Sequence, residues 1–221
     1  MKLDFLTVGR IYIESLYKIK DSQITEFKEK LTGECLSIAI NGSVLKAKTG
    51  IVACVGRDAY GITELLERYN VDYSNLLLSN EKSGRIVNLG KKYIFEGTNK
   101  FLKLDPDILE RAKIIHVCDD LEIAKKVMKM NKKCILSSSL DTEADIIFSE
   151  KEGTGNRILL GEKIRFKNKT FDTKFKKKNK SAFIAGFLAR YCKTQSFDSS
   201  LRYGISAMNA CKNEILGGLN G

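Results

Sequence analysis

The chain has 221 residues, of which 43% are hydrophobic, and its 38 Lys and Arg against 27 Asp and Glu give a net charge of +11. This length suits one domain, and this hydrophobic content can build a core, which excludes a chain that is disordered throughout. Apolar runs stay well short of the roughly 18 residues that a membrane span needs, and the N-terminal MKLDFLTVGR lacks a signal-peptide core. We therefore expect a cytoplasmic protein with no membrane partner, and the positive charge favours an anionic partner.

The predicted strands of the first half are, in chain order, residues 3–8, 11–19, 51–55, 76–78, 85–89 and 92–95. Residues 20–30 are charged with few apolar anchors, so we expect a loop or a short surface helix there. Helices are expected at residues 36–48, despite Gly42, and from Asp58 to Asn70, where the Asp58 carboxylate would cap the first turn.

In the second half, strands and helices alternate, which predicts a parallel sheet covered by helices. The expected order is a helix at 107–111, a strand at 114–118, a helix at 121–130, strands at 134–138 and 145–148, and helices at 181–192 and 199–215. The last helix would end at Gly217-Gly218. Residues 163–180 are rich in lysine, so we expect a solvated loop there, with contact to phosphate groups as the alternative.

The six cysteines lie apart in the sequence, and none forms a Cys-x-x-Cys pair. Zinc sites need paired ligand spacing, and the chain has a single histidine, His116, in an apolar run that predicts a core or rim position. We therefore expect buried, reduced thiols and no metal cage. The cysteines are Cys35, Cys54, Cys118, Cys134, Cys192 and Cys211.

Two segments carry a resemblance to a known family. The first contains GRDAYG at residues 56–61, followed by NVD at residues 70–72, and the second contains AFIAGF at residues 182–187, ahead of two predicted helices. In this order, at the two ends of an α/β chain, they resemble the ribokinase-type (ribokinase / phosphofructokinase-B) carbohydrate kinase family. The chain is a shortened and divergent version of that pattern.

The resemblance implies a particular α/β architecture. We expect a ribokinase-like three-layer sandwich with a mostly parallel central sheet and a small β flap that acts as a lid. A single domain would span residues 1–221, with flap strands from about residues 11–19 and 85–95. Because flap strands of the family often pair between subunits, a homodimer is a further expectation, and exposed edge strands favour such pairing.

The family transfers a phosphoryl group from ATP to a hydroxyl of a sugar or nucleoside, which needs a base, amide donors and Mg²⁺. The resemblance places Ser181 at the position of the catalytic Asp and Lys178-Asn179-Lys180 at the Gly-rich turn that binds phosphate. A serine hydroxyl cannot act as a general base near neutral pH, and lysine disfavours the left-handed turn that glycine permits. A looped-out insertion could return Asp172 as a relocated base; otherwise Asp172 is a solvated acid among lysines.

On the substrate side, the resemblance places Glu14 at a substrate-binding Asp, Gly33-Glu34 at a Gly-Gly pair, and Ser37 at an Asn. Glu14 is equally consistent with an outward-facing strand residue. Glu34 adds bulk and charge where substrate hydroxyls would approach the backbone, which argues against binding a sugar in the manner of the family.

The remaining motif positions concern the metal and the nucleotide. Glu152 keeps the Glu of an N-x-x-E motif and would be the metal ligand, although the Asn is lost. Gly161 is the one glycine that remains of the turn against ATP. Asp58 and Gly61 fit helix capping and close packing better than a substrate role.

These positions lead to a hypothesis about function. The residues that the fold needs are kept, whereas those that phosphate chemistry needs are changed. We therefore expect a small-molecule kinase homologue that is weak or inactive and uses ATP and Mg²⁺ if active. The alternative is a non-catalytic pseudokinase that binds a nucleotide, a sugar phosphate or a protein partner. A basic nucleic-acid-binding protein ranks third, because no aromatic stacking platform accompanies the lysines.

Overall fold

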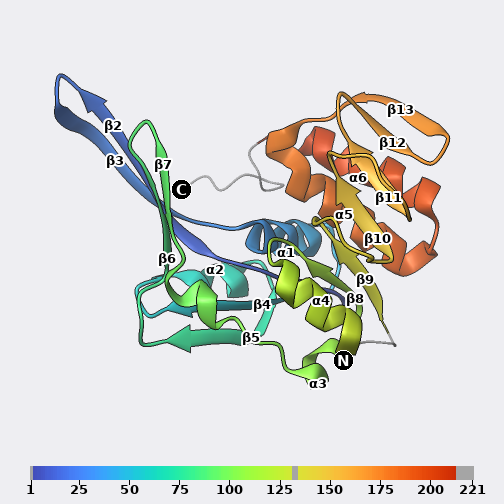
Figure 1. The fold of residues 1–221 in the computed structure, drawn as a ribbon, viewed down its shortest axis with the longest axis horizontal. Coiled ribbons are helices and arrows are strands. Elements are labelled where there is room, and N and C mark those ends of the chain that lie inside the picture. Colours follow the sequence, from blue (N-terminus) through green and yellow to red (C-terminus); the bar gives the residue numbers. More distant parts are fainter. Residues whose placement is uncertain (1, 131–133, 213–221) are drawn as a thin grey trace.

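The computed structural model describes residues 2–130 and 134–212 of the chain. In this part, a large β-sheet lies between two layers of helices, and a second, smaller sheet projects away from them as a lid (Figure 1). No helix among these residues is long and apolar enough to cross a membrane. The arrangement confirms the predicted fold class of a three-layer α/β sandwich with a β flap.

The central sheet has nine strands within the described residues. They are β1 (Leu3–Val8), β4 (Thr49–Gly56), β5 (Asp72–Ser79), β8 (Ala112–Val117), β9 (Ile135–Ser138), β10 (Ile146–Ser149), β11 (Arg157–Leu160), β12 (Lys163–Phe166) and β13 (Lys169–Lys174). Their spatial order is β13-β12-β11-β10-β9-β8-β1-β4-β5. All neighbours from β5 to β11 are parallel, and β12 and β13 extend the sheet in antiparallel fashion.

Helices cover both faces of this sheet. The helices are α1 (Glu34–Val44), α2 (Ile62–Arg68), α3 (Pro106–Leu109), α4 (Leu121–Met130), α5 (Lys180–Thr194) and α6 (Phe197–Ala210), with 3₁₀ turns η1 (Gly97–Phe101) and η2 (Lys177–Asn179). One core lies under α1, α2, α5 and α6, and the other lies under α3 and α4. Because β1 and β4 are covered on both sides, they are buried at every residue, which explains why most of their residues are apolar.

Helices α5 and α6 pack closely because glycine lies at their contact. A Cβ added to Gly186 would lie 2.8 Å from the Cβ of Ala207 and 3.0 Å from the Cα of Gly204. A Cβ on Gly204 would in turn lie 2.8 Å from the backbone oxygen of Phe183. The glycine of the AFIAGF segment is therefore required by helix packing.

The lid contains four of the described strands, β2 (Tyr12–Lys20), β3 (Gln23–Thr32), β6 (Gly84–Asn88) and β7 (Lys92–Phe95), in the order β3-β2-β6-β7. Strands expected at residues 11–19 and 85–95 are present, but the prediction of a loop or helix at residues 20–30 is wrong. This segment forms β3, which pairs antiparallel with β2 through a two-residue turn in which Asp21 and Ser22 both have positive φ. Pairing with β2 satisfies its backbone, so few apolar anchors are needed.

Apolar side chains are exposed on the lid. Ile24 is 60% exposed and Phe27 is 53% exposed on β3, while Ile94 is 55% exposed and Phe95 is 59% exposed on β7. Strands β3 and β7 are also the two edges of the lid sheet. The homodimer expected from the flap stays a prediction.

The predicted helix from Asp58 to Asn70 is shorter than expected, and the proposed cap is wrong. Helix α2 begins at Ile62, and Gly61 precedes it with a φ of 76°. The Asp58 carboxylate instead accepts hydrogen bonds from the backbone N–H and the hydroxyl of Ser83, each at 2.8 Å. It also pairs with Arg85 at 3.1 Å, so Asp58 links the body to lid strand β6.

The lysine-rich segment from residue 163 is folded, so the prediction of a solvated loop is wrong for most of it. Strand β12 alternates exposed lysine and arginine with buried Ile164 and Phe166, and the Phe166 ring stacks on Phe197 with centroids 4.4 Å apart. The alternation is the ordinary pattern of a half-buried strand, which the charge of the segment obscured. The last helix, α6, ends at Ala210, and Gly217-Gly218 lie outside the described residues.

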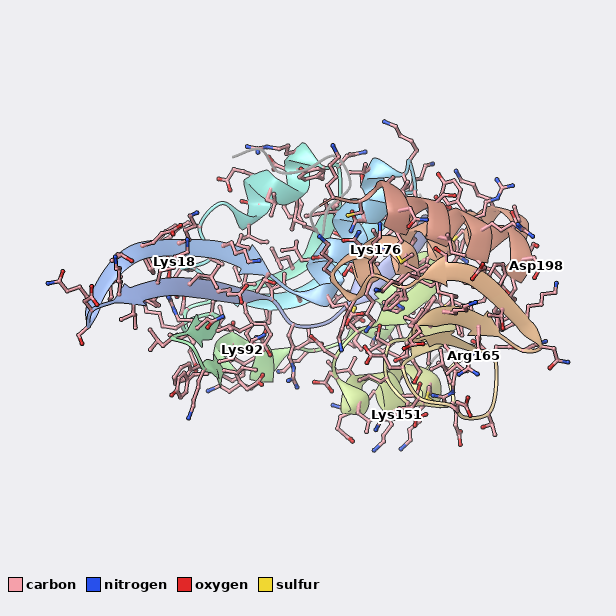
Figure 2. All side chains as sticks on the ribbon, turned by 90° about the horizontal axis from the view of Figure 1, so that it is seen from above. Lys18, Lys92, Lys151, Arg165, Lys176 and Asp198 are labelled. Atoms are coloured by element: carbon pink, nitrogen blue, oxygen red, sulfur yellow. The ribbon has the colours of Figure 1, made fainter. Side chains whose placement is uncertain are left out.

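The excess of basic side chains is distributed over the molecule. Figure 2 shows Lys18 and Lys92 on the lid, and Lys151, Arg165 and Lys176 on the body of the molecule. Several basic residues of the 163–180 segment are paired with acids from other elements or with their own strand partner. These pairs are Lys163–Asp172, Arg165–Glu152, Lys169–Asp198 and Lys177–Glu150.

Candidate functional site

The candidate site lies at the carboxyl end of the central strands. In open parallel sheets, ligands bind at this end, where helices begin. Strands β1, β8 and β9 end at Val8, Val117 and Ser138, and helices α1 and α5 begin at Glu34 and Lys180. Charged and hydroxyl side chains from these segments are in contact with one another, as follows.

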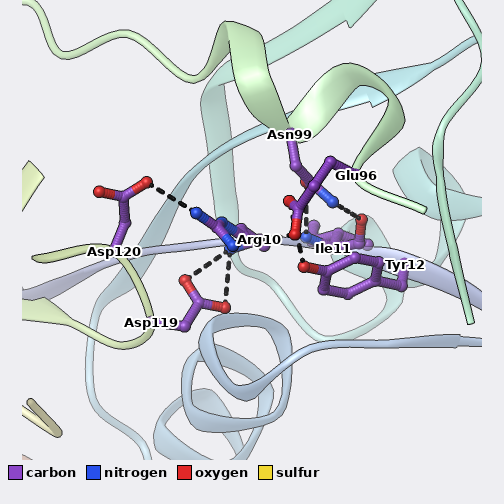
Figure 3. A network of polar contacts seen from close by, with 7 residues as sticks. All are labelled: Arg10, Ile11, Tyr12, Glu96, Asn99, Asp119 and Asp120. Carbon is purple, nitrogen blue, oxygen red and sulfur yellow. Dashed lines mark hydrogen bonds and ion pairs between the residues drawn. The ribbon is translucent and has the colours of Figure 1, made fainter. Parts of the chain in front are cut away.

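Arg10, which follows β1 after one glycine, is the centre of a polar network (Figure 3). Its backbone N–H donates to both carboxylate oxygens of Asp119, at 3.2 and 3.3 Å. Its guanidinium pairs with Asp120 at 3.2 Å and with Glu96 at 3.2 Å, and the Tyr12 hydroxyl lies 3.5 Å from Glu96. The network therefore joins the end of β1 to the residues after β8 and to the base of the lid.

Asn99 in η1 fixes the beginning of the lid in the same network. Its Oδ1 accepts from the N–H of Ile11 at 3.2 Å, and its Nδ2 donates to the carbonyl of Ile11 at 3.1 Å (Figure 3). Both residues are buried, so these two bonds satisfy backbone groups that water cannot reach. Strand β2 thus leaves the body of the molecule at a fixed point.

The Asp119 carboxyl has an unusual pKa. Burial raises the pKa from 3.8 to about 6, and the negative charges of Glu34 and Asp120 act in the same direction. The N–H and the positive charge of Arg10 oppose this shift without cancelling it. Asp119 therefore changes protonation within the range in which a general base is useful.

We call residues 177–181 the head of α5. They comprise η2 and the first two residues of the helix, and none of them has a positive φ. The N–H of Asn179 donates to the carbonyl of Lys176 at 2.8 Å and so is engaged within the turn. The head is thus a right-handed 3₁₀ turn that leads into Ser181, without the left-handed geometry that a glycine turn provides.

Asn179 lies at the phosphate position implied by the resemblance, but its side chain is turned to the protein interior. The residue is 1% exposed, and its Nδ2 donates to the carbonyls of Met208 at 2.9 Å and Cys211 at 2.6 Å. This amide therefore fastens the head of α5 to the end of α6. Lys178, by contrast, is exposed.

Two residues predicted for different subsites are brought together. Lys180 Nζ lies 3.0 Å from Glu34 Oε1, which joins the first residue of α5 to the first residue of α1. The hydroxyl of Ser139 donates to the same Glu34 oxygen at 2.7 Å. The Glu34 carboxylate at the head of α5 is therefore already engaged by a cation and a hydroxyl.

His116 contacts Ser139, the hydroxyl partner of Glu34. It is fully buried, with Nδ1 at 2.9 Å from the hydroxyl of Ser137 and Nε2 at 3.3 Å from the hydroxyl of Ser139. Burial, assisted by the positive charge of Lys180, lowers its pKa to about 3. The ring therefore stays neutral at physiological pH, and its predicted core position is confirmed.

Two cavities flank the network. The first, of about 310 Å³, lies at the ends of β9, β10 and β11 and is lined by Ser139, Ser149, Glu150, Lys151 and Lys180 among others. The second, of about 260 Å³, lies between the lid and the body and is lined by Ile13, Glu29, Lys30, Leu31, Asp58, Ala59 and Tyr60. We call them the head cavity and the lid cavity.

Three predicted residues lie on the outer part of the sheet, apart from the head of α5. Asp172, on edge strand β13, has a side chain that is 91% exposed and that pairs with Lys163 at 2.8 Å. Glu152 is 76% exposed and pairs with Arg165 at 3.0 Å. Gly161 lies in the turn between β11 and β12.

The substrate-side candidates occupy the lid and α1. Glu14 lies opposite Lys30 on the paired lid strands, and their charged groups are 3.4 Å apart. Gly33 precedes α1, where a Cβ would lie only 2.4 Å from the carbonyl oxygen of Arg10, so only glycine fits. Ser37 is partly buried in the first turns of α1.

The head cavity offers groups suited to ATP phosphates. Lys180, Ser139 and Ser149 supply a cation and hydroxyl donors, which phosphate oxygens accept. Mg²⁺ takes oxygens from one or two carboxylates together with phosphate oxygens. The carboxylates on the cavity wall are Asp141 and Glu150, whereas Glu152 does not line it. Within the described residues, no group of three or more His, Cys, Asp or Glu side chains could hold a metal by itself.

The polar residues of the network were missed by sequence reasoning. Asp119 and Asp120 follow directly after the predicted strand at residues 114–118, and Ser139 follows the next predicted strand. Polar residues at the carboxyl ends of successive parallel strands meet at one edge of the sheet, and this signal could have identified them. All six cysteines are free thiols, and the prediction that they are buried holds for four of them, whereas Cys134 and Cys192 are partly exposed.

Comparison with known proteins bears on the fold. No protein-family model matches the chain, and no curated protein does either. Among solved structures, the ribokinase of Thermotoga maritima matches with a TM-score of 0.76 at 15% identity, covering 96% of this chain and 97% of that one. The Arabidopsis thaliana ribokinase complexed with ribose and ATP matches with a TM-score of 0.74 at 18% identity, covering 96% and 93%. The chain has a ribokinase-like fold.

A nucleoside kinase shares this fold as well. That protein, from Methanocaldococcus jannaschii, matches with a TM-score of 0.70 at 15% identity, covering 94% of this chain and 91% of its own. These structural matches establish a ribokinase-like fold. At such low sequence identity, the activity has to be argued from the site.

Proposed function

We propose that this chain is a ribokinase-type small-molecule kinase homologue in which ATP-dependent phosphoryl transfer to a sugar or nucleoside hydroxyl is weak or absent. The observation that carries the proposal is the head of α5. Ser181 stands there in place of a carboxylate, and the turn before it is a right-handed 3₁₀ turn. Two carboxylates reach the head, and both are already paired: Glu34 with Lys180 and Glu150 with Lys177.

The relatives in fold give the substrate class. The Arabidopsis ribokinase is complexed with ribose and ATP, and a sugar kinase of Pyrococcus horikoshii is in complex with ATP. In this chain the head cavity would take the phosphates of ATP, and the lid cavity would take the acceptor alcohol. If Mg²⁺ takes part, Asp141 and Glu150 are the carboxylates on the cavity wall that would hold it.

Turnover measurement tests the proposal. A general base contributes about 10²–10⁴ in rate, and kinases typically turn over at about 1–100 s⁻¹. We therefore expect kcat below about 1 s⁻¹ in a coupled ADP-release assay with ATP, Mg²⁺ and a panel of sugars and nucleosides. A kcat above about 1 s⁻¹ with any acceptor would overturn the proposal.

Replacing Ser181 by Asp separates the base from the rest of the site. We expect Ser181→Asp to raise kcat less than about 10-fold, because the turn before it still lacks the geometry of an anion cradle. Ser181→Asn is the matched control, with nearly the same shape and no basic oxygen pair. A gain of about 100-fold in the Asp variant alone would show that only the base has been lost.

A non-catalytic pseudokinase is the second candidate, and one observation favours it. The head cavity keeps Lys180 and two hydroxyl groups on its wall although the base is missing. A ligand that binds the folded chain raises its melting temperature, so a thermal-shift screen with nucleotides, sugars and sugar phosphates tests it. Binding of nucleic acid is favoured less, because several lysines of the 163–180 segment are already paired with acids.

A further inference from the structure

The Lys180–Glu34 pair differs from the surface ion pairs of the molecule. Its side chains are only 25% and 23% exposed, whereas those of Lys177 and Glu150 are 79% and 52% exposed. Partial burial reduces screening by water and salt, so the attraction between these two charges is stronger than at the surface. Lys180 is thereby neutralised by a group of the same chain.

Glu34 also lies beside the N-termini of two helices, where an anion is favoured. Helices α1 and α5 both begin here, with Glu34 and Lys180 as their first residues. The N-terminus of a helix carries a partial positive charge and free N–H donors, which favour anions. The Glu34 carboxylate therefore lies where two helix N-termini and a lysine favour negative charge.

Glu34 is also held in this orientation. Ser139 donates to its Oε1 at 2.7 Å, and the Ser139 hydroxyl is in turn 3.3 Å from Nε2 of the buried His116. The His116 ring is fixed on its other side by Ser137 at 2.9 Å. A chain of buried or half-buried groups thus keeps the carboxylate against Lys180.

The head cavity opens next to this contact. Lys180 and Ser139, the two partners of Glu34, both line its wall, whereas Glu34 does not. An anion that enters the cavity meets a lysine and a hydroxyl that are already occupied. We propose that Glu34 is an internal counter-ion that blocks phosphate binding at the head of α5, so that a phosphate-bearing ligand binds only by displacing it from Lys180 and Ser139. The proposal rests on the proposed function, because it names the regulation of the same site.

Calorimetric titration with inorganic pyrophosphate tests this autoinhibitory contact. We expect Glu34→Gln to bind pyrophosphate at least about 10-fold more tightly than the wild type at the same salt concentration, because Lys180 is released. Glu122→Gln is the matched control: it removes one negative charge from an exposed pair with Lys125 on α4 and should bind like the wild type. Adding Lys180→Met to Glu34→Gln should cancel the gain.

A Kd of Glu34→Gln within about 2-fold of the wild type, or weaker binding, would overturn the proposal. If this variant does not fold, as judged by circular dichroism, Glu34→Ala takes its place. It removes the same carboxylate and keeps Lys180 and Ser139, so it should tighten binding by at least about 10-fold, and no gain there overturns the proposal equally. A parallel titration with ADP shows whether the released site takes nucleotides as well as free phosphate.

The titration needs no turnover, so its failure differs from failure of the proposed function. A wild-type chain with kcat above about 1 s⁻¹ overturns the eroded-kinase proposal and leaves the pyrophosphate comparison intact. Equal pyrophosphate binding by wild type and Glu34→Gln overturns the counter-ion and leaves the turnover prediction intact.

Discussion

Helix α5 has two parts that are under different constraints. Every residue from 182 to 189 is buried between the sheet and its neighbouring helices, and we call this part the body of α5. The head, residues 177–181, carries three lysines and meets charged groups from α1 and the loop after β10. The body keeps the AFIAGF sequence that resembles a kinase family, whereas the head does not. Close packing therefore accounts for the sequence of the body of α5, whatever the residues of the head do.

The largest expected effect concerns the body. Gly186→Val should lower the free energy of unfolding by about 3 kcal/mol or more. The Cβ of the valine alone would lie 2.8 Å from the Cβ of Ala207 and 3.0 Å from the Cα of Gly204. Backbone and a short side chain cannot move aside as a long side chain can. Urea denaturation followed by circular dichroism measures the loss.

Gly161→Ala is the control for Gly186→Val. The nearest atom to a Cβ at residue 161 is 3.9 Å away, so this change should have little effect on stability. Equal losses at residues 161 and 186 would contradict the idea that close helix packing fixes the body of α5.

A smaller effect is expected from replacing Asp119, which lies in the polar network of the candidate site. This change should raise the free energy of unfolding, whereas Gly186→Val should lower it. Its folded pKa of about 6 exceeds the ordinary 3.8, so between these values the folded state binds more protons than the unfolded state. The free energy of unfolding therefore falls as pH rises from about 4 to about 6, and the loss persists above pH 6. Asp119→Asn should be more stable than the wild type by roughly 1–3 kcal/mol at pH 7, and the difference should vanish near pH 4.

The measurement is urea denaturation of both proteins at several pH values between 4 and 7.5. Glu122→Gln, on the exposed face of α4, controls for removal of a negative charge and should follow the wild-type pH profile. If Asp119→Asn were less stable than the wild type at pH 7, the ionised carboxylate would be a net stabilising partner of Arg10. Burial would then not be the dominant influence on Asp119.

The sequence was sufficient to predict the architecture where one physical signal dominated. Strands β1, β4 and β8 are covered by helices on both faces, so each is an apolar run that is easily located. Strands β3, β11, β12 and β13 were missed, and in β12 the charge of the segment masked an alternation of exposed and buried residues. Their partners supply the backbone hydrogen bonds, and that contribution is not visible in the segment itself.

The sequence predicted which positions belong to the candidate site, but not which of their side chains contact one another. Sequence reasoning identified Lys180 and Glu34 as altered motif residues, but assigned them to different subsites. Their ion pair depends on how α1 and α5 converge, which local sequence does not specify. Asp58 shows the same limit, because its carboxylate suits a helix cap locally and instead binds Ser83 and Arg85, about 25 residues further on.

The smallest expected effect is that of replacing Asp172. This change tests whether Asp172 can supply the base that the head of α5 lacks. A relocated base would have to reach the head of α5, whereas the Asp172 side chain is 91% exposed on edge strand β13. Its pKa is lowered by the hydrogen bond from Lys163 and by the charge of that lysine, which makes it a weaker base. Asp172→Asn should therefore leave the melting temperature within about 2 °C of the wild type and any ADP release within about 2-fold. Abolished turnover in a folded Asp172→Asn variant would instead place the base on β13, and the head of α5 would no longer be the part of the molecule that limits phosphoryl transfer.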